Sequence, residues 1–344
     1  MRVLGWPAYK FREINPYPWL LYTHLSKHDV STDEFSASRL LFGGYDILHV
    51  HWPEHHFIRP SALQTLLRAV CVLAILSIAR VCGTRLVWTV HNMQPHKRYH
   101  PMIEKWFWKL FPRLIDAYFS LNFSALEQIK REYPALFRKK GFVALHGHYR
   151  GFYRDDISKE DARRKLDIEV SATVIGFLGR VSVYKNTVSL IKSFLQLRDK
   201  NLILLLAGAP DSVSIEEING LAKKDSRIHL YLDFIQEGDI QLYLKAADLV
   251  VLPFQEILNS GTAMLSLSFN CPILVPEKGS MGELRGYVGD EWVRTYTAEL
   301  TSEKIQDALN WAKGGRTTGC PDLERFDWNK VAEQTKNGFK RCLE

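Results

Sequence analysis

Residues 246–262 read AADLVVLPFQEILNSGT, and this stretch decides the class of fold. Residues 248–252 (DLVVL) contain a short run of branched apolar side chains, which predicts a buried β-strand. Ser260-Gly261-Thr262 follows soon after, and a serine ahead of small residues is typical of a helix start. A buried strand that leads into a helix is the repeating unit of a parallel α/β sheet.

The same alternation of strand and helix runs through the rest of the second half of the chain. Each apolar run is followed by a stretch with helical periodicity, so further strand–helix units are predicted on both sides of residues 246–262. The predicted strands are Val174–Gly179, Asn201–Ala207, 227–232 and Pro272–Val275, and the predicted helices are 186–198, 214–223 and 238–247.

The first half repeats this pattern with its own strands and helices. The chain of 344 residues is also too long for a typical single core, so two parallel-sheet domains are predicted. The strands expected here are Arg2–Gly5, Asp46–His51, Thr84–His91, Ala117–Asn122 and Val143–His146, with helices over 61–82 and 101–113. We expect an N-terminal domain over 1–150, a second domain over 151–327, and a helix over 328–344 that packs back toward the first domain.

Charge is distributed unevenly along the chain. Residues 51–150 carry 15 Lys and Arg against 5 Asp and Glu, whereas residues 151–344 carry 25 against 28. The basic region predicts an anionic partner, such as a phospholipid surface or a lipid-linked phosphate, although a solvated face without a partner gives the same count. No basic-aromatic repeat indicates nucleic acid, so no nucleic-acid partner is expected.

The cysteines and the N-terminus indicate a compartment. Five scattered cysteines without CxxC spacing suit a reducing environment better than a disulfide framework or a zinc site. The first ten residues, MRVLGWPAYK, lack the apolar segment of a signal peptide. A cytoplasmic protein is therefore expected.

Residues 69–79 (AVCVLAILSIA) form the most apolar run, and Arg68 and Arg80 flank it. Eleven residues are well short of the roughly 20 that span a bilayer. A buried core helix is the default interpretation. The alternative is a helix that places an apolar face into a membrane surface beside the basic region.

Three strand ends in the second half carry residues suited to binding an anionic ligand. Gly179-Arg180 is followed by Lys185, and two cations on a glycine-bearing loop suit a diphosphate. Ser260, Gly261 and Thr262 present backbone amides and the positive end of a helix dipole. Glu256, just ahead of them, is placed to accept hydrogen bonds from sugar hydroxyls. Residues 276–283 form a third glycine-bearing loop.

Four phrases of this half resemble the donor domain of glycosyltransferase family 4, and they span most of residues 174–285. The phrases are GFLGRVSVYKN (176–186), LAGA (206–209), QLYLKAADLVVLPF (241–254) and NCPILVP (270–276). The resemblance implies the GT-B fold, in which two Rossmann-like parallel-sheet domains face each other across a cleft. It also implies that Arg180 and Lys185 hold the diphosphate of a UDP- or GDP-linked sugar.

The chain departs from the family pattern at its paired glutamates. These residues, eight positions apart, should fall near Ile257 and Leu265, whereas this chain has Glu256 and no carboxylate near 265. The pattern resembles a divergent branch that includes bacterial exopolysaccharide enzymes, among them β-mannosyltransferases. The departure leaves open whether transfer retains or inverts the anomeric configuration.

Polar side chains also end the strands of the first half. Thr89-Val90-His91-Asn92 resembles the family phrase whose histidine faces the transferred sugar, and His51 and Glu54 follow another strand. His96 is expected at the same edge. If transfer inverts, Glu54 is the first choice of base, with His51 and His91 as alternatives. If it retains, no base is needed and His91 positions the sugar.

The expected function is therefore metal-independent hexosyl transfer to a lipid-linked acceptor. No acidic DxD pair stands at a predicted strand end, so no metal or other cofactor is expected beyond the nucleotide sugar. A polyprenyl-diphosphate-linked oligosaccharide at the inner face of the plasma membrane suits the basic, aromatic N-terminal half. A non-catalytic sugar-binding protein and a nucleotide-sugar epimerase are the alternatives, since both can share this fold.

Overall fold

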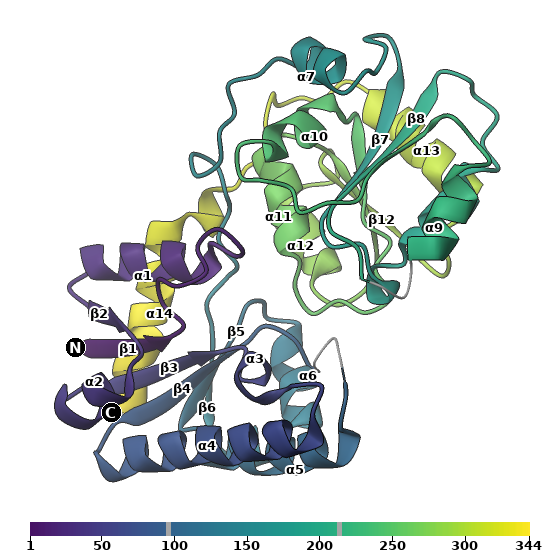
Figure 1. Ribbon diagram of the computed structural model, residues 1–344. Coiled ribbons are helices and arrows are strands. Elements are labelled where there is room, and N and C mark those ends of the chain that lie inside the picture. The colour runs from purple at the N-terminus through teal and green to yellow at the C-terminus, as the bar shows by residue number, and fades with distance from the viewer. Residues whose placement is uncertain (94–97, 212–214) are drawn as a thin grey trace. The chain divides into compact units, whose positions relative to one another are not determined.

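The computed structural model describes residues 1–93, 98–211 and 215–344, and its contacts divide the chain into two compact units. Unit 1 comprises Met1–Gly147 together with Phe326–Glu344, and unit 2 comprises His148–Arg325. Each unit contains one six-stranded sheet in which all neighbouring strands are parallel (Figure 1). The α/β class and the two parallel sheets predicted from the sequence are confirmed.

The sheet of unit 1 has the strand order β2-β1-β3-β4-β5-β6. Helices α1 and α14 cover one face, and α4 and α5 cover the other (Figure 1). The strands are β1 Arg2–Trp6, β2 Ser31–Glu34, β3 Ile47–His51, β4 Arg85–Val90, β5 Ala117–Ser120 and β6 Lys140–Val143. The helices are α1 Tyr17–Lys27, α2 Ala37–Phe42, α3 Glu54–Phe57, α4 Ala62–Val81, α5 Pro101–Leu114, α6 Ala125–Glu132 and α14 Trp328–Leu343.

The C-terminal helix α14 belongs to unit 1, where it packs against α1 and β6. Its Phe339 is fully buried, and Gly338 lies so close to Phe119 that a Cβ there would meet the ring at 2.5 Å. The glycine thus allows the helix backbone to pack directly on the sheet.

The sheet of unit 2 has the order β12-β11-β10-β7-β8-β9, so its first strand lies in the middle. This is the doubly wound order in which ligands bind at the carboxyl ends of the two central strands. The strands are β7 Thr173–Leu178, β8 Leu202–Ala207, β9 Ile228–Tyr231, β10 Leu249–Val251, β11 Ile273–Pro276 and β12 Val293–Tyr296. The helices are α7 Lys159–Lys165, α8 Thr187–Phe194, α9 Ile215–Ala222, α10 Ile240–Ala246, α11 Gly261–Ser268, α12 Met281–Val288 and α13 Ser302–Lys313.

The strand predicted at Val143–His146 is wrong in its position. The last strand of unit 1, β6, ends at Val143, because the amide of Leu145 donates to Gln334 Oε1 of α14 at 2.9 Å and leaves the ladder. The strand begins at Lys140 instead. Gly141 pairs with Tyr118 there, and a Cβ at that glycine would meet the Tyr118 hydroxyl at 2.5 Å.

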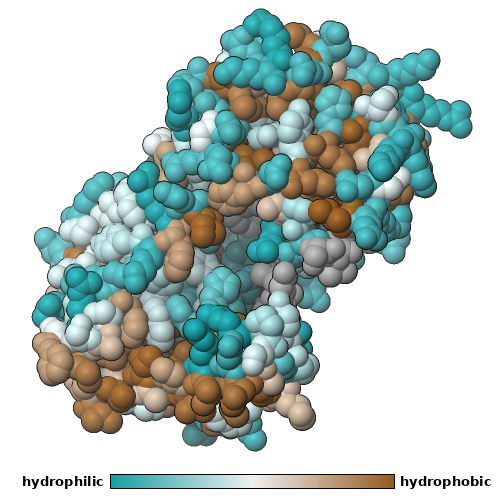
Figure 2. Space-filling view, in the orientation of Figure 1, coloured by the Kyte–Doolittle hydropathy of each residue, from teal (hydrophilic) through white to brown (hydrophobic). Residues whose placement is uncertain are grey.

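The default interpretation of residues 69–79 as a buried core helix is also wrong. Helix α4 buries only the stripe of Thr65, Ala69, Val72, Leu76 and Ala79. Only 28% of its most apolar 18-residue stretch is buried. Apolar side chains also occupy its outer face, and Figure 2 shows hydrophobic surface gathered over α4 and α5. The exposed apolar residues of α4 are Leu63, Leu66, Leu67, Val70, Ile78 and Val81.

Candidate active site

The predicted donor residues of unit 2 lie at the carboxyl ends of its two central strands. Gly179 follows β7 with φ +124°, a conformation that favours glycine. A Cβ at this position would meet Lys185 Nζ at 2.7 Å and Thr262 Oγ1 at 3.2 Å. The structure therefore brings Gly179, Lys185 and Thr262 together, from the loop after β7 and the first turn of α11.

Lys185 is a buried cation. It ends a short 3-10 turn, Val183–Lys185, and its Nζ lies 3.4 Å from Thr262 Oγ1. The amino group also lies 5.5 Å from the ring centre of Phe254 and 5.9 Å from that of Phe177. Burial, with a smaller contribution from the positive charge of Arg180, lowers the pKa of Lys185 to about 8. A poorly solvated ammonium group of this kind is stabilised by a bound anion.

Arg180 is held by a partner that the sequence did not point out. Its Nε donates to Asp211 Oδ1 at 2.8 Å, and its side chain is 61% exposed. Asp211 follows β8, and a parallel bridge between Val181 and Pro210 joins the two loops. The position of Asp211 just after a buried strand is the signal that could have identified it.

Helix α11 begins at the predicted small-residue turn. The Ser260 side chain caps the helix by accepting from the Ala263 amide at 3.0 Å. The amides of Gly261 and Thr262 belong to the first turn, where helix geometry provides no internal acceptor. This arrangement suits an anion at the helix N-terminus.

Glu256 lies exposed in the loop between β10 and α11. The neighbouring Gln255 amide donates to Tyr184 O at 3.1 Å, which ties this loop to the turn that carries Lys185. On its other side, Gly279 packs so closely that a Cβ would meet Ile257 O at 1.9 Å. The three glycine-bearing or small-residue loops predicted from the sequence therefore form one cluster.

The three residues predicted to be catalytic also lie near one another, in unit 1. His51 ends β3, His91 follows β4, and the two rings are joined by a hydrogen bond of 2.9 Å between His51 Nδ1 and His91 Nε2. Glu54 begins α3 and hydrogen-bonds the side chain of Asn92. His96 lies outside the described residues.

Burial changes the protonation of these three groups. It raises the pKa of Glu54 to about 7, although hydrogen bonds from its own backbone amide and from Asn92 oppose the rise. Burial lowers the pKa of His51 to about 3 and that of His91 well below its ordinary value. Near neutral pH the imidazoles are thus uncharged, and Glu54 is poised between carboxylic acid and carboxylate, as a general base requires.

Aromatic rings enclose His91. Trp52 stacks on it with ring centres 3.9 Å apart, and Tyr17 meets it edge-on at 5.0 Å. Trp52 adopts φ +42°, a left-handed conformation that is uncommon for a large side chain. Sequence reasoning missed Tyr17, because it lies on α1, a helix that the apolar pattern did not indicate.

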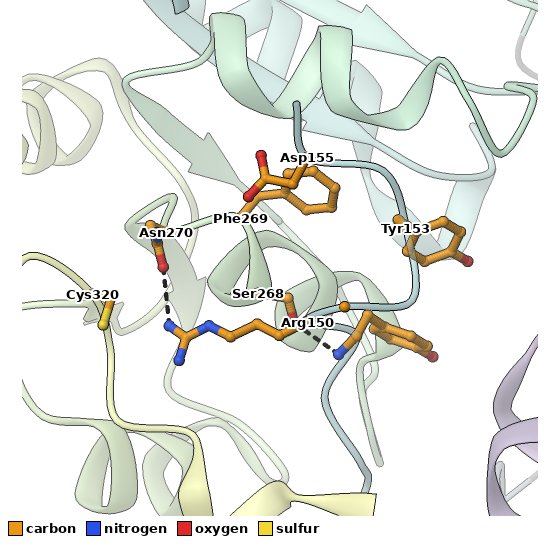
Figure 3. Close-up of a pocket in the computed structure, with 9 residues that line it drawn as sticks. Arg150, Tyr153, Asp155, Ser268, Phe269, Asn270 and Cys320 are labelled. Atoms are coloured by element: carbon orange, nitrogen blue, oxygen red, sulfur yellow. Dashed lines mark hydrogen bonds between the residues drawn. The ribbon is translucent and has the colours of Figure 1, made fainter. Parts of the chain in front are cut away.

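A cavity of about 400 Å³ in unit 2 contains none of the predicted donor residues. It lies beside the C-terminal end of α11, where Arg150 Nη2 donates to Asn270 Oδ1 at 2.9 Å (Figure 3). The same nitrogen donates to Pro321 O, also at 2.9 Å. The Tyr149 amide donates to Ser268 Oγ at 2.9 Å. These bonds hold the segment that leads to α7 against the C-terminal end of α11.

Within the described ranges, no group of three or more His, Cys, Asp or Glu side chains is arranged to hold a metal ion. The metal independence expected from the sequence stays a prediction.

Comparison with known proteins agrees with this geometry. Residues 172–310 match the family described as glycosyl transferases group 1. Over 325 residues the chain is 28% identical to the GDP-mannose:glycolipid 4-beta-D-mannosyltransferase of Xanthomonas campestris pv. campestris, covering 93% of this chain and 86% of that protein. The resemblance to the β-mannosyltransferase branch is thereby supported.

Solved structures show the same fold. Sucrose-phosphate synthase from Thermosynechococcus elongatus matches with a TM-score of 0.70 at 13% identity, covering 99% of this chain and 98% of that one. The Anabaena protein HepE in complex with UDP and glucose matches with a TM-score of 0.69 at 15% identity, covering 99% and 100%. The chain is a glycosyltransferase with the GT-B fold, and its match to the glycosyl transferases group 1 family lies within unit 2.

Proposed function

We propose that the chain transfers a mannosyl group from GDP-mannose to a hydroxyl of a lipid-linked saccharide, with inversion at the anomeric carbon. The observation that carries this proposal is the similarity, over 93% of the chain, to a GDP-mannose:glycolipid 4-beta-D-mannosyltransferase. A β-linked product formed from an α-linked nucleotide sugar requires inversion. The proposed acceptor is a polyprenyl-diphosphate-linked oligosaccharide in surface polysaccharide assembly.

Unit 2 supplies the groups that hold the donor in this proposal. Lys185 and Arg180 neutralise the diphosphate, and the Gly261 and Thr262 amides at the start of α11 donate to its oxygens. As the bond between the anomeric carbon and the diphosphate breaks, its electron pair passes to the leaving oxygen. The same cations stabilise the charge that develops there. Glu256 is proposed to accept hydrogen bonds from the sugar hydroxyls.

Unit 1 supplies the base. The acceptor oxygen attacks the anomeric carbon and transfers its proton to the Glu54 carboxylate, which near neutral pH is available in part because its pKa is about 7. His51 and His91 are uncharged at this pH, and His91 is proposed to hydrogen-bond the transferred sugar. Glu54 is preferred as base because burial leaves the imidazoles with much lower basicity.

Donor identity is tested with a panel of nucleotide sugars in a thermal-shift assay, followed by transfer to an extracted lipid-linked acceptor. Stabilisation by GDP and GDP-mannose, with mannose recovered in the lipid fraction, is the expected result. Stabilisation by UDP-linked or ADP-linked sugars alone would overturn the choice of GDP-mannose. Anomeric proton couplings in the product then distinguish inversion from retention.

We further propose that unit 1 binds an anionic membrane surface through the outer faces of α4 and α5. The apolar part consists of the six exposed residues of α4 already described, with Met102 and Trp106 of α5. Lys105, Lys109 and Arg113 are exposed on the same helix as Met102 and Trp106. An apolar strip beside cations is typical of helices that lie in the plane of an anionic bilayer.

The packing of α4 favours a helix that lies on the bilayer over one that crosses it. One stripe of α4 packs in unit 1, and the helix contacts α2, α3, α5 and β4. Crossing a bilayer would require these contacts to break. Helix α4 is long and apolar enough to cross a membrane, but we interpret it as an interfacial helix because of these contacts.

Flotation with vesicles of anionic phospholipid tests this surface. The protein is expected to float at low salt and to float less at high salt, because added salt screens the basic residues. Leu67→Glu with Val70→Glu should abolish flotation, whereas Val170→Glu, an exposed apolar site of unit 2, should not change it. Flotation that survives the double substitution would contradict the assignment.

A further inference from the structure

We propose that Tyr22 is a positioning residue for the transfer reaction, because its hydroxyl joins three buried histidines into one hydrogen-bonded chain that ends at His91. This inference rests on the proposed function in one respect, namely that His91 contacts the transferred sugar. The hydrogen-bonded chain lies entirely within unit 1.

The hydrogen-bonded chain runs through five side chains, which come from α1, β3, β4 and the residue that follows β4. His49 Nε2 lies 2.7 Å from Thr89 Oγ1, and His49 Nδ1 lies 2.9 Å from the Tyr22 hydroxyl. The same hydroxyl lies 3.0 Å from His51 Nε2. His51 Nδ1 in turn lies 2.9 Å from His91 Nε2. All four distances are those of ordinary hydrogen bonds.

The strand geometry explains why two histidines reach one hydroxyl. His49 and His51 stand two positions apart on β3, so both side chains lie on the same face of the sheet. The Tyr22 hydroxyl on α1 reaches both histidines from that face, and Thr89 on the neighbouring β4 is the register partner of His51. The chain therefore links α1 to two central strands of unit 1.

All members of the hydrogen-bonded chain are buried. His49, His51 and Tyr22 are fully buried, Thr89 is 2% exposed and His91 is 8% exposed. Burial favours the uncharged imidazoles and the protonated phenol. Each neutral ring then has one nitrogen that donates and one that accepts.

Counting donors leaves two self-consistent arrangements of the protons. Tyr22 has a single hydroxyl proton, so it donates to one of its two imidazole nitrogens and accepts from the other. If it donates to His51 Nε2, then His51 Nδ1 donates to His91 Nε2, and the proton of His91 lies on Nδ1. If it donates to His49, then His51 Nε2 donates to Tyr22 and His91 Nε2 donates to His51 Nδ1. In that second arrangement His91 Nδ1 carries the lone pair.

The tautomers of His49, His51 and His91 are therefore coupled through the Tyr22 hydroxyl. Neither His51 nor His91 changes its tautomer alone, since that would leave two donors or two acceptors opposed in a buried bond. Removing the Tyr22 hydroxyl uncouples His51 and His91 from His49. The tautomer of His91 is then no longer tied to that of His49.

Tyr22→Phe tests the inference, and Tyr118→Phe is its matched control. Tyr118 is another buried tyrosine of unit 1, and its hydroxyl has no hydrogen-bond partner among the described residues. We expect Tyr22→Phe to lower kcat by about tenfold to about a hundredfold, at an unchanged KM for the nucleotide sugar. Tyr118→Phe should leave kcat and KM near wild type.

Nitrogen-15 NMR of histidine-labelled protein gives the readout that a general packing defect would not move. Tyr22→Phe should change the tautomer signals of both His51 and His91, while Tyr118→Phe should change neither. Wild-type tautomers or a wild-type kcat in Tyr22→Phe would overturn the inference. If Tyr22→Phe does not fold, Thr89→Val removes the far end of the chain with a side chain of equal size. In that variant the tautomers of His49 and His91 are expected to change together, and a change at His49 without one at His91 would overturn the inference.

Different measurements would overturn the proposed function and the inference about Tyr22. Kinetics are run with whichever nucleotide sugar the wild-type protein uses, so a wrong donor appears in the wild type and not in the variants. The NMR experiment needs no substrate at all. A changed tautomer with an unchanged kcat would show that Tyr22 orders the histidines without positioning them for transfer, and would overturn the inference.

Discussion

Unit 1 and unit 2 both bury reactive side chains at the carboxyl ends of parallel strands, but they treat charge in opposite ways. In unit 1, burial keeps His51 and His91 uncharged and raises the pKa of Glu54 to about 7. In unit 2, a buried lysine whose pKa is lowered only to about 8 remains largely charged at neutral pH. Its neighbours are an exposed arginine and a helix N-terminus, which also attract anions.

The difference assigns a separate task to each unit. A site that takes a proton needs a group whose pKa is near the working pH, and low polarity around Glu54 provides one. A site that holds a diphosphate needs positive charge that stays in place throughout the reaction. Changes in unit 1 are thus expected to alter the rate of chemistry, and changes in unit 2 to alter donor binding as well.

The largest effect is expected from a substitution of Glu54, which should change the rate of chemistry without changing donor binding. Glu54→Gln keeps the shape and the ability to hydrogen-bond Asn92, but it cannot accept a proton. We expect kcat to fall by more than about a hundredfold while GDP binding stays normal. Turnover by rapid mixing and GDP affinity by calorimetry check the two parts. A near-normal rate would remove Glu54 as the base.

The next effect belongs to unit 2. Lys185→Ala, or the volume-preserving Lys185→Met, removes a charge-assisted contact to the diphosphate, so the donor KM is expected to rise by about tenfold to about a hundredfold. Arg180→Ala should act in the same direction, with a smaller change because its side chain is exposed. Lys192→Ala is the control, since Lys192 is an exposed lysine paired with Glu217. Wild-type kinetics in both Lys185→Ala and Arg180→Ala would refute the donor-site assignment.

A pH profile compares the two units in one experiment. Glu54 accepts a proton only when ionised, so kcat/KM should rise about tenfold per pH unit below pH 7 and level off above it. Lys185 binds the diphosphate when protonated, so kcat/KM should fall as pH rises above about 8. The result is a narrow bell-shaped profile.

Two controls assign the limbs of that profile. Glu54→Gln should lose the rising limb, and Lys185→Met should lose the falling one. With saturating donor the falling limb of kcat should move to higher pH, because a bound diphosphate stabilises the ammonium form. A profile of kcat/KM that is flat between pH 6 and pH 9 would contradict both assignments.

The sequence was sufficient for much of the fold because the apolar periodicity was strong. Runs such as residues 201–207 and 248–252 are short, branched and apolar, and the structure places β8 and β10 there. The edge strand β2 was missed, since it reads STDE and has no apolar run to detect. The misplaced strand near Val143 depended on Gln334, which lies nearly two hundred residues away in the sequence.

The candidate sites were predictable to different degrees. The loop from Gly179 to Lys185 is a local motif, so its spacing in the sequence was enough to predict that Arg180 and Lys185 lie on the same loop. The chain through Tyr22 depends on α1 packing over β3, a tertiary contact that no local pattern indicates. Helix α4 was misjudged for a related reason, because apolar composition does not tell which partner, protein or otherwise, covers each face.

The smallest expected effect is that of a metal chelator. A diphosphate leaving group needs positive charge, which a divalent cation can supply in other enzymes. In unit 2, Lys185, Arg180 and the first turn of α11 provide positive charge from the protein itself. EDTA is therefore expected to change the rate by less than about twofold in the wild type, measured after gel filtration to remove bound ions. Lys185→Met gives a sharper form of the test, because added Mg²⁺ should restore neither donor binding nor activity to this variant. A wild-type enzyme that EDTA inactivates and Mg²⁺ restores would show that the cation cluster of unit 2 does not suffice, and the contrast between the two units would have to include a metal.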